Sequence, residues 1–195
     1  MTRRLIPILI VVAAICVAAI GYLYVYPRGG GLAAAVPIGG PIHLTDQNGK
    51  PFDSASLDGK PYAVFFGFTN CPDACPTTLS EIARATDELG ASAKELTTLF
   101  ITVDPERDTP AVLKDYISNF GGNTIGLSGT PEQVAEVAKE YRIFYQKSPT
   151  SDGGYTMDHT AVLYLMGRKG EFRDVIAYSE EHARYVEKIK KLLTE

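Results

Sequence analysis

The pattern of apolar and polar positions divides the chain into a long apolar run, a short linker and a mixed α/β domain. Residues 5–26 carry no charge and are rich in Ile, Val, Ala and Leu. At a rise of about 1.5 Å per residue this run spans about 30 Å, the thickness of the hydrocarbon core of a bilayer. We therefore predict a cytoplasmic N-terminus and one transmembrane anchor at 1–26, a Gly-, Pro- and Ala-rich linker at 27–40, and a folded domain at 41–195.

The residues that flank the apolar run predict its orientation. Arg3 and Arg4 precede the run and only Arg28 follows it closely, which favours a cytoplasmic N-terminus. A cleaved secretory signal is the alternative, because the small residues at 32–36 could serve a peptidase. Signal h-regions, however, are usually only about 7–15 residues long, and the run lacks the amphipathic, Arg- and Ser-rich character of a mitochondrial transit peptide. These features favour a single-pass protein of a bacterial inner membrane with its domain in the periplasm.

Apolar strands and amphipathic helices alternate through the domain. The expected elements are a hairpin at 42–53, a strand at 62–68, a helix at 77–89, a strand at 96–103, a helix at 110–120, a strand at 124–127, a helix from 130 to 141, strands at 159–165 and 172–178, and a final helix through 193. Such an order predicts an α/β thioredoxin-like fold, a mixed sheet flanked by helices, with an N-terminal β-hairpin.

Local signals set the expected ends of these elements. Thr78 with Glu81 makes a capping box for the helix at 77–89. Thr109 caps the helix that Pro110 opens, and Ser179 caps the last helix. Residues 147–157 are polar and contain two consecutive glycines, so they predict a flexible loop.

Charge and cysteine content narrow the classes of function. The formal net charge is −4 and no basic cluster is present, which argues against nucleic-acid binding. Cys16 lies in the apolar run, which leaves Cys71 and Cys75 as the only pair outside it. In an oxidising compartment, an isolated close pair on a domain with its own core indicates redox or metal chemistry more than a structural disulfide.

The cysteine pair lies where an apolar strand meets the start of a helix. A helix N-terminus favours the thiolate, which is both the nucleophile and the metal ligand. Three residues separate Cys71 from Cys75, one more than in thioredoxins, so the pair can close a disulfide but is not preset for exchange. Thiolates prefer Cu(I) or Zn(II), and a nearby imidazole would make a three-coordinate site suited to both copper oxidation states.

The chain has three histidines that could supply such an imidazole. His43 in the hairpin and His182 on a charged helix face are interpreted as surface or packing residues. His159 opens a strand directly after the predicted loop, and in thioredoxin-like folds this segment faces the active-site cysteines. It is therefore the candidate third ligand; the alternative is that it only bonds to the loop backbone.

Three separated motifs resemble the Sco/SenC family of copper-binding assembly factors for cytochrome c oxidase. They are FGFTNCPDACP at 66–76, TVDPERDTP at 102–110 and DHT at 158–160, and the similarity extends from about Pro41 to Leu193 and includes the single N-terminal anchor. Thr160 stands where the family usually has Ser, which leaves the imidazole in place.

The resemblance implies a metallochaperone, not an enzyme, that binds one copper ion, as Cu(I) or Cu(II), through Cys71, Cys75 and His159. It implies cytochrome c oxidase subunit II as the partner, and other periplasmic copper chaperones or thiol reductants are further candidates. Family members deliver copper, or reducing equivalents, to the dinuclear copper site of that subunit. Three carboxylates, Asp104, Asp108 and Asp158, are candidates to support the ligands or contact the partner, the alternative being solvated or capping residues.

Other functions remain open. A periplasmic thiol-disulfide oxidoreductase that reduces the cysteines of the copper site is the main alternative, and it predicts that loss of His159 would spare disulfide exchange. A thiol peroxidase is less favoured, because its reactive cysteine usually follows a Thr-x-x-Cys pattern and Thr69 is one residue too close. A redox or copper sensor also fits the residues.

Overall fold

The computed structural model describes residues 11, 13–18, 21–22 and 37–195, and residues 38–195 form a compact unit. Most of the predicted anchor at 1–26 and of the linker at 27–40 lies outside the described residues. Within the part of the chain that the structure describes, no helix has the length and apolar character needed to span a membrane.

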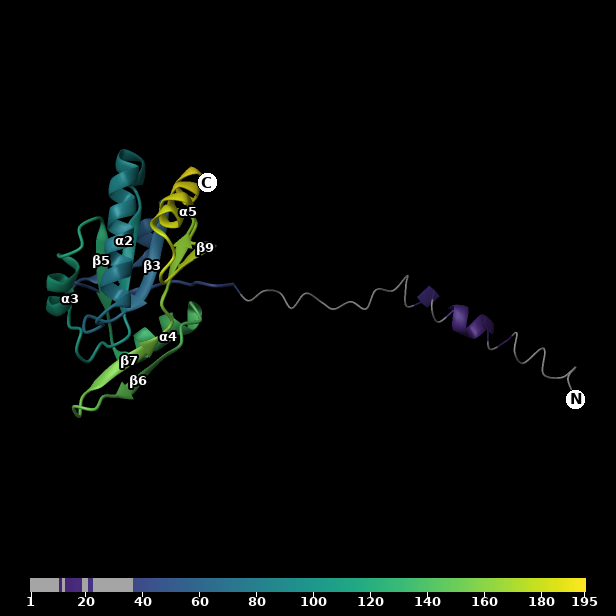
Figure 1. Cartoon of the computed structure of the whole chain (residues 1–195), viewed down its shortest axis with the longest axis horizontal. Coiled ribbons are helices and arrows are strands. Elements are labelled where there is room, and N and C mark those ends of the chain that lie inside the picture. Colours follow the sequence, from purple (N-terminus) through teal and green to yellow (C-terminus); the bar gives the residue numbers. More distant parts are fainter. Residues whose placement is uncertain (1–10, 12, 19–20, 23–36) are drawn as a thin grey trace, which may run out of the picture. The chain divides into compact units, whose positions relative to one another are not determined.

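A seven-stranded mixed sheet forms the centre of the compact unit (Figure 1). Its strands, in their order across the sheet, are β2 (Pro51–Asp53), β1 (His43–Asp46), β5 (Thr124–Ser128), β4 (Thr97–Thr102), β3 (Tyr62–Gly67), β8 (Val162–Met166) and β9 (Phe172–Ala177). The three central strands β5, β4 and β3 are parallel, and the outer strands pair antiparallel. The predicted mixed sheet, with a hairpin at its N-terminal end, is confirmed.

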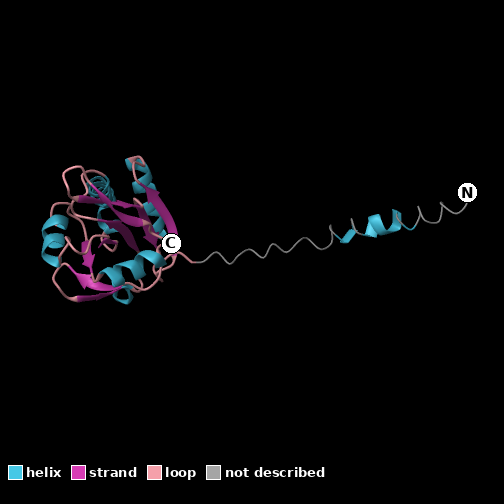
Figure 2. Cartoon of the chain, turned by 90° about the horizontal axis from the view of Figure 1, so that it is seen from below, coloured by secondary structure: helices cyan, strands magenta, loops and turns pink. Residues whose placement is uncertain are grey.

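Helices cover both faces of the sheet (Figure 2). They are α2 (Ala74–Leu89), α3 (Pro110–Ile117), α4 (Pro131–Glu140) and α5 (His182–Thr194), with short 3₁₀ turns η2 (Ser54–Leu57) and η3 (Gly90–Ala93). Neighbouring residues of β3 point to opposite faces. Gly67 lies against Cys75 of α2, whereas Phe66 packs against Tyr141 at the end of α4, with ring centroids 5.5 Å apart. Thus α2 and α4 lie on opposite faces, and α5 packs beside α2.

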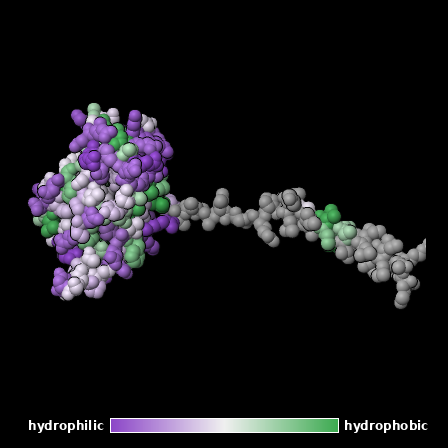
Figure 3. Space-filling model, viewed as in Figure 1, coloured by the Kyte–Doolittle hydropathy of each residue, from purple (hydrophilic) through white to green (hydrophobic). Residues whose placement is uncertain are grey.

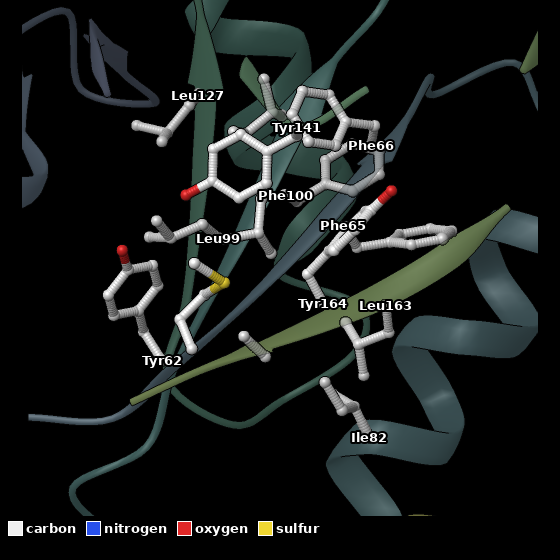
Figure 4. Close-up of a cluster of buried hydrophobic side chains, with 14 of the residues drawn as sticks. Tyr62, Phe65, Phe66, Ile82, Leu99, Phe100, Leu127, Tyr141, Leu163 and Tyr164 are labelled. Carbon is white, nitrogen blue, oxygen red and sulfur yellow. The ribbon is translucent and has the colours of Figure 1, made fainter. Parts of the chain in front are cut away.

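The hydrophobic core fills the space between the sheet and these helices. Every residue of β3 and β4 is buried, as expected for parallel strands covered on both faces. Figure 4 labels ten of the core side chains: Tyr62, Phe65, Phe66, Ile82, Leu99, Phe100, Leu127, Tyr141, Leu163 and Tyr164. The outer surface of the unit on view in Figure 3 is mainly hydrophilic, which fits helices whose apolar faces point inward.

Two predicted helix starts are wrong. Helix α2 begins at Ala74 with Asp73 as its N-cap, so Thr78 is a buried residue inside the helix and no cap. Pro76 is tolerated there because the first turn of a helix does not use its backbone N–H groups. Helix α5 begins at His182 after Glu181, not after Ser179. The predicted cap at Thr109 is confirmed, and Thr130 caps α4 where the sequence places the start of that helix.

The predicted flexible loop at 147–157 is also wrong. Strands β6 (Tyr145–Pro149) and β7 (Tyr155–His159) form an antiparallel hairpin there, as a two-stranded sheet of its own. Only one face of this hairpin packs on the domain, so most of its residues are polar and its apolar signal is weak. His159 therefore ends β7, and the next strand, β8, begins at Val162.

Candidate metal centre

The two cysteines lie in the turn that joins β3 to α2. The Cys71 N–H donates to the Phe68 carbonyl at 3.2 Å, which folds the chain back toward the helix. Cys75 is fully buried in the first turn of α2, whereas Cys71 is partly exposed. The backbone N–H of Cys75 donates to Cys71 Sγ at 3.4 Å, so the free N–H groups of the helix start are directed at this sulfur.

Gly67 allows α2 to approach β3 so closely. A Cβ atom at this position would lie 2.7 Å from Cys75 Sγ and 2.7 Å from a ring carbon of Phe100. Real side chains do not reach such distances, so only glycine leaves room for the buried sulfur.

His159 approaches the cysteines from the end of β7. Its Nε2 lies 3.7 Å from Cys75 Sγ, and its Nδ1 lies 3.2 Å from the Thr160 carbonyl oxygen. A carbonyl oxygen can only accept, so Nδ1 donates its proton there, and Nε2 is the ring nitrogen directed at the sulfurs. Two phenylalanine rings hold the imidazole edge-on, Phe65 at 6.4 Å and Phe68 at 5.8 Å between centroids.

The structure thus brings all three predicted ligand residues together. The ligand atoms of Cys71, Cys75 and His159 lie within 4.8 Å of one another, a group that could hold one metal ion. An open cavity of about 350 Å³ lies over the group and is lined by Cys71 and His159 but not by Cys75. A ligand from solution therefore meets Cys71 and His159 before the buried sulfur.

The two thiols have opposite pKa shifts. The hydrogen bond from the Cys75 thiol lowers the pKa of Cys71 to about 4, helped by His159 and the backbone N–H groups of Asp73 and Cys75 and opposed by burial. The pKa of Cys75 is raised by its hydrogen bond to Cys71, by burial and by the Cys71 charge. Neither cysteine is in a disulfide in this structure, so without metal the pair carries one thiolate, Cys71, and one thiol, Cys75, near neutral pH.

Asp104 and Asp108 are not solvated loop residues, because each is only 1% exposed. Asp108 accepts bonds from the Thr69 N–H at 2.9 Å, the Thr69 hydroxyl at 2.6 Å and the Thr102 hydroxyl at 2.6 Å. It therefore fixes the segment just before Cys71 to the end of β4. Asp104 forms an ion pair with Arg107 and accepts a hydrogen bond from the Tyr155 hydroxyl at 3.0 Å. It therefore contacts β7, the strand that carries His159.

Asp158 and the other two histidines lie outside the metal group. Asp158 is exposed and accepts bonds from Ser148 and Gln146 across the hairpin. His43 lies 3.5 Å from the exposed Asp53. The ring nitrogens of His182 lie 2.8 Å from Glu81 and 3.1 Å from Glu88, where the imidazole links α5 to α2.

Arg107 and Tyr155 are the site residues that sequence reasoning missed. Tyr155, Met157 and His159 are spaced by two residues, a pattern that indicates a strand with these side chains on the face that packs against the domain. The four polar residues between Lys147 and Gly153 concealed this signal.

Comparison with known proteins decides the family. The SCO1/SenC family profile matches residues 31–194. The chain belongs to the SCO1/SenC family. The SCO2-like protein RP587 of Rickettsia prowazekii is 42% identical over 139 residues, covering 70% of this chain and 68% of that protein. The human mitochondrial SCO1 homolog is 40% identical over 140 residues, covering 70% of this chain and 46% of the human protein, so the chain spans about half the length of that relative.

Solved Sco structures confirm the thioredoxin-like α/β fold. Copper-bound ScoI of Bradyrhizobium japonicum is 48% identical, with a TM-score of 0.73 over 80% of this chain and 99% of that one. Copper-bound yeast Sco1 is 37% identical, with a TM-score of 0.74 over 82% and 90%. BsSco, a member of the Sco family of cytochrome c oxidase assembly proteins with a disulfide switch, is 23% identical with a TM-score of 0.64 and supports the fold alone.

Proposed function

We propose that this Sco protein is a copper metallochaperone that binds one copper ion through Cys71, Cys75 and His159. Its role is to assist assembly of the dinuclear copper site of cytochrome c oxidase subunit II. The observation that carries the proposal is the convergence of two sulfurs and one imidazole nitrogen within 4.8 Å. Copper-bound structures of two relatives, 48% and 37% identical, support copper as the ion.

The donor set suits an ion that must be both held and released. Two thiolates match Cu(I), and the imidazole extends the site to Cu(II). The Cys71 thiolate is available before metal arrives, whereas the Cys75 thiol must give up its proton when the metal binds. Three protein donors under an open cavity leave a coordination position where a recipient protein can add its own ligand.

The unequal thiols also favour a second candidate function, thiol-disulfide exchange with the copper-site cysteines of subunit II. The Cys71 thiolate would attack the partner disulfide, forming a mixed disulfide and releasing one partner thiolate. Cys75 would then lose its proton to a partner thiolate and attack Cys71 Sγ, which releases the second partner thiolate. The partner gains two electrons, and Cys71 and Cys75 end as a disulfide that no longer offers thiolates to copper.

Mixing experiments with the soluble copper domain of subunit II separate the two functions. The copper-loaded chain should transfer copper to the reduced, metal-free domain, and His159→Ala should fail to do so. Metal is followed by mass spectrometry of the separated proteins, and thiols by alkylation. A chain that passes no copper to the reduced domain, yet reduces the oxidised domain equally well with and without His159, contradicts the metallochaperone role.

We further propose that residues 1–26 anchor the protein in a bacterial inner membrane, followed by a linker at 27–40 and a periplasmic domain at 41–195. The uncharged run at 5–26 and the arginines before it support this topology. After alkaline carbonate extraction the chain should stay in the membrane pellet, and protease added to spheroplasts should digest the domain. Release by carbonate, or a mature chain that lacks the run by mass spectrometry, would indicate a cleaved signal instead.

A further inference from the structure

The hairpin that carries His159 packs on the domain through one of its faces, which includes Met157 of β7 and Tyr145 of β6. Strands β6 and β7 form a sheet separate from the main one. Side chains of Tyr155, Met157 and His159 share one face of β7, because residues two apart point the same way. Met157 is buried in the core, and at the base of the hairpin the Thr160 N–H donates to the Phe144 carbonyl at 2.9 Å. The position of His159 therefore depends on what holds this face in place.

Tyr155, at the far end of β7, is held by two residues of the loop after β4. Its hydroxyl donates to Asp104 Oδ1 at 3.0 Å, and Arg107 Nη1 donates to its backbone carbonyl at 2.9 Å. The guanidinium carbon of Arg107 also lies 3.8 Å from the centroid of the Tyr155 ring. The ion pair of Arg107 with the buried Asp104 closes this set of contacts.

We propose that Asp104, Arg107 and Tyr155 form a latch that positions β7 and so holds His159 over the cysteines. None of the three belongs to the metal group, so they are positioning residues. Tyr155 and His159 are the two ends of one strand, about 13 Å apart at a rise of about 3.3 Å per residue, with buried Met157 between them. Fixing one end of the strand restricts the other, which lowers the entropy that the imidazole must lose when it binds metal.

The inference rests on the proposed function, because it assigns the latch to a ligand of the copper site. The affinities for Cu(I) and Cu(II) should respond differently to a change in the latch. Cu(I) can be held by two thiolates alone, whereas Cu(II) needs the imidazole. Loosening the latch is therefore expected to weaken Cu(II) binding more than Cu(I) binding.

A neighbouring ion pair on the same hairpin provides a matched control. Lys147 of β6 pairs with Glu106 at 2.6 Å and lies 4.7 Å from the Tyr155 ring centroid. Both side chains are about half exposed, 46% and 57%, and exposed pairs contribute little because water and salt screen them. Lys147→Gln removes one charge from the hairpin and leaves the latch contacts in place.

Two conservative variants loosen the latch without leaving a buried charge unpaired. Tyr155→Phe removes only the hydroxyl that donates a hydrogen bond to Asp104. Arg107→Lys keeps a positive charge near Asp104 but loses the planar fork that also reaches the Tyr155 carbonyl. Asp104 itself is left unchanged, because removing a buried carboxylate would leave the Arg107 charge without its partner and destabilise the whole domain.

Hydrogen exchange on the metal-free full chain tests the latch directly. The amides of β7 should exchange about tenfold faster in Tyr155→Phe and Arg107→Lys, while those of β3 stay as in the wild type. Lys147→Gln should match the wild type throughout. Unchanged exchange of β7 in both latch variants overturns the latch, as does faster exchange spread evenly over the domain, which would mean general destabilisation.

Copper binding by the same proteins tests the link to His159. In both latch variants Cu(II) should bind about tenfold more weakly, with reduced nitrogen coupling in the EPR spectrum, while Cu(I) affinity stays within about twofold. A wild-type Cu(II) affinity and spectrum in the variants overturns the positioning role. Cu(II) binding that is indifferent to His159→Ala would instead overturn the proposed ligand set, and the exchange data would still decide whether the latch orders β7.

Discussion

The two cysteine residues differ in burial and in charge although they are four positions apart. Cys71 is partly exposed and receives hydrogen bonds from the start of α2, whereas Cys75 is buried beneath it. A thiolate is stabilised where donors converge and a thiol where they do not. Cys71 is therefore the sulfur that meets an incoming metal ion or disulfide first.

Alkylation of the reduced, metal-free chain tests this difference. Thiolates react and thiols do not, so the rate at Cys71 should stay constant from about pH 8 to about pH 5 and fall only toward its pKa of about 4. Cys75 should stay unmodified over this range. His159→Ala removes a hydrogen bond that lowers the pKa of Cys71, so the plateau should end at a higher pH. Peptide mapping that shows both cysteines equally modified would contradict the assignment.

Asp108 should contribute to stability through the three hydrogen bonds that it accepts. In Asp108→Asn the amide has only one acceptor oxygen and places an NH₂ group against donors, so the free energy of unfolding should fall by about 2–3 kcal/mol. The exposed Asp115 of α3 supplies the control, and Asp115→Asn should change stability by less than about 0.5 kcal/mol. Urea denaturation measures both, and equal stability of the two variants would show that the buried bonds contribute little.

The packing of α2 on β3 brings Cys75 to the site, and Gly67 allows it. In Gly67→Ala the added methyl group would meet Cys75 Sγ and Phe100, each at 2.7 Å, and both of these side chains are fully buried. We expect a loss of about 1–3 kcal/mol in the free energy of unfolding and weaker copper binding, because the sulfur must move.

Gly154, at the exposed tip of the β6–β7 hairpin, provides the control for this substitution. A Cβ atom there would come no closer than 3.2 Å, to the hydroxyl of Thr150 on the surface. Thermal unfolding of Gly154→Ala should therefore differ from the wild type by less than about 1 kcal/mol. If the two alanine variants are equally stable and bind copper alike, the close approach at Gly67 has no role in the site.

Elements with a strong local signal were predicted closely from sequence, and elements defined by tertiary contacts were not. The continuous apolar run of β3 and the Thr-Pro starts of α3 and α4 lie where the pattern places them. The β6–β7 hairpin was mistaken for a loop because it buries little more than Met157. Cys71, Cys75 and His159 could be predicted from residue type and motif, whereas the contact of Arg107 with Tyr155 depends on how the hairpin lies on the domain.

The whole domain is needed to assemble the site. Residues 38–195 form a compact unit with their own sheet and core. The site draws on the turn between β3 and α2, the loop after β4 and the end of β7, which are far apart in the sequence. An unfolded chain does not hold these groups together, so copper should bind and stabilise the folded form.

Copper titration of a reduced fragment of residues 37–195 tests the central claim most directly. Wild type, His159→Ala and the control His43→Ala, whose imidazole side chain is 65% exposed, are compared for stoichiometry and for the thiolate-to-Cu(II) charge-transfer band. The account predicts one equivalent of copper with a strong band in the wild type and in His43→Ala, and loss of that band in His159→Ala. No stable binding, or binding that is the same without His159, would contradict a two-sulfur, one-imidazole copper carrier and favour the thiol-disulfide oxidoreductase.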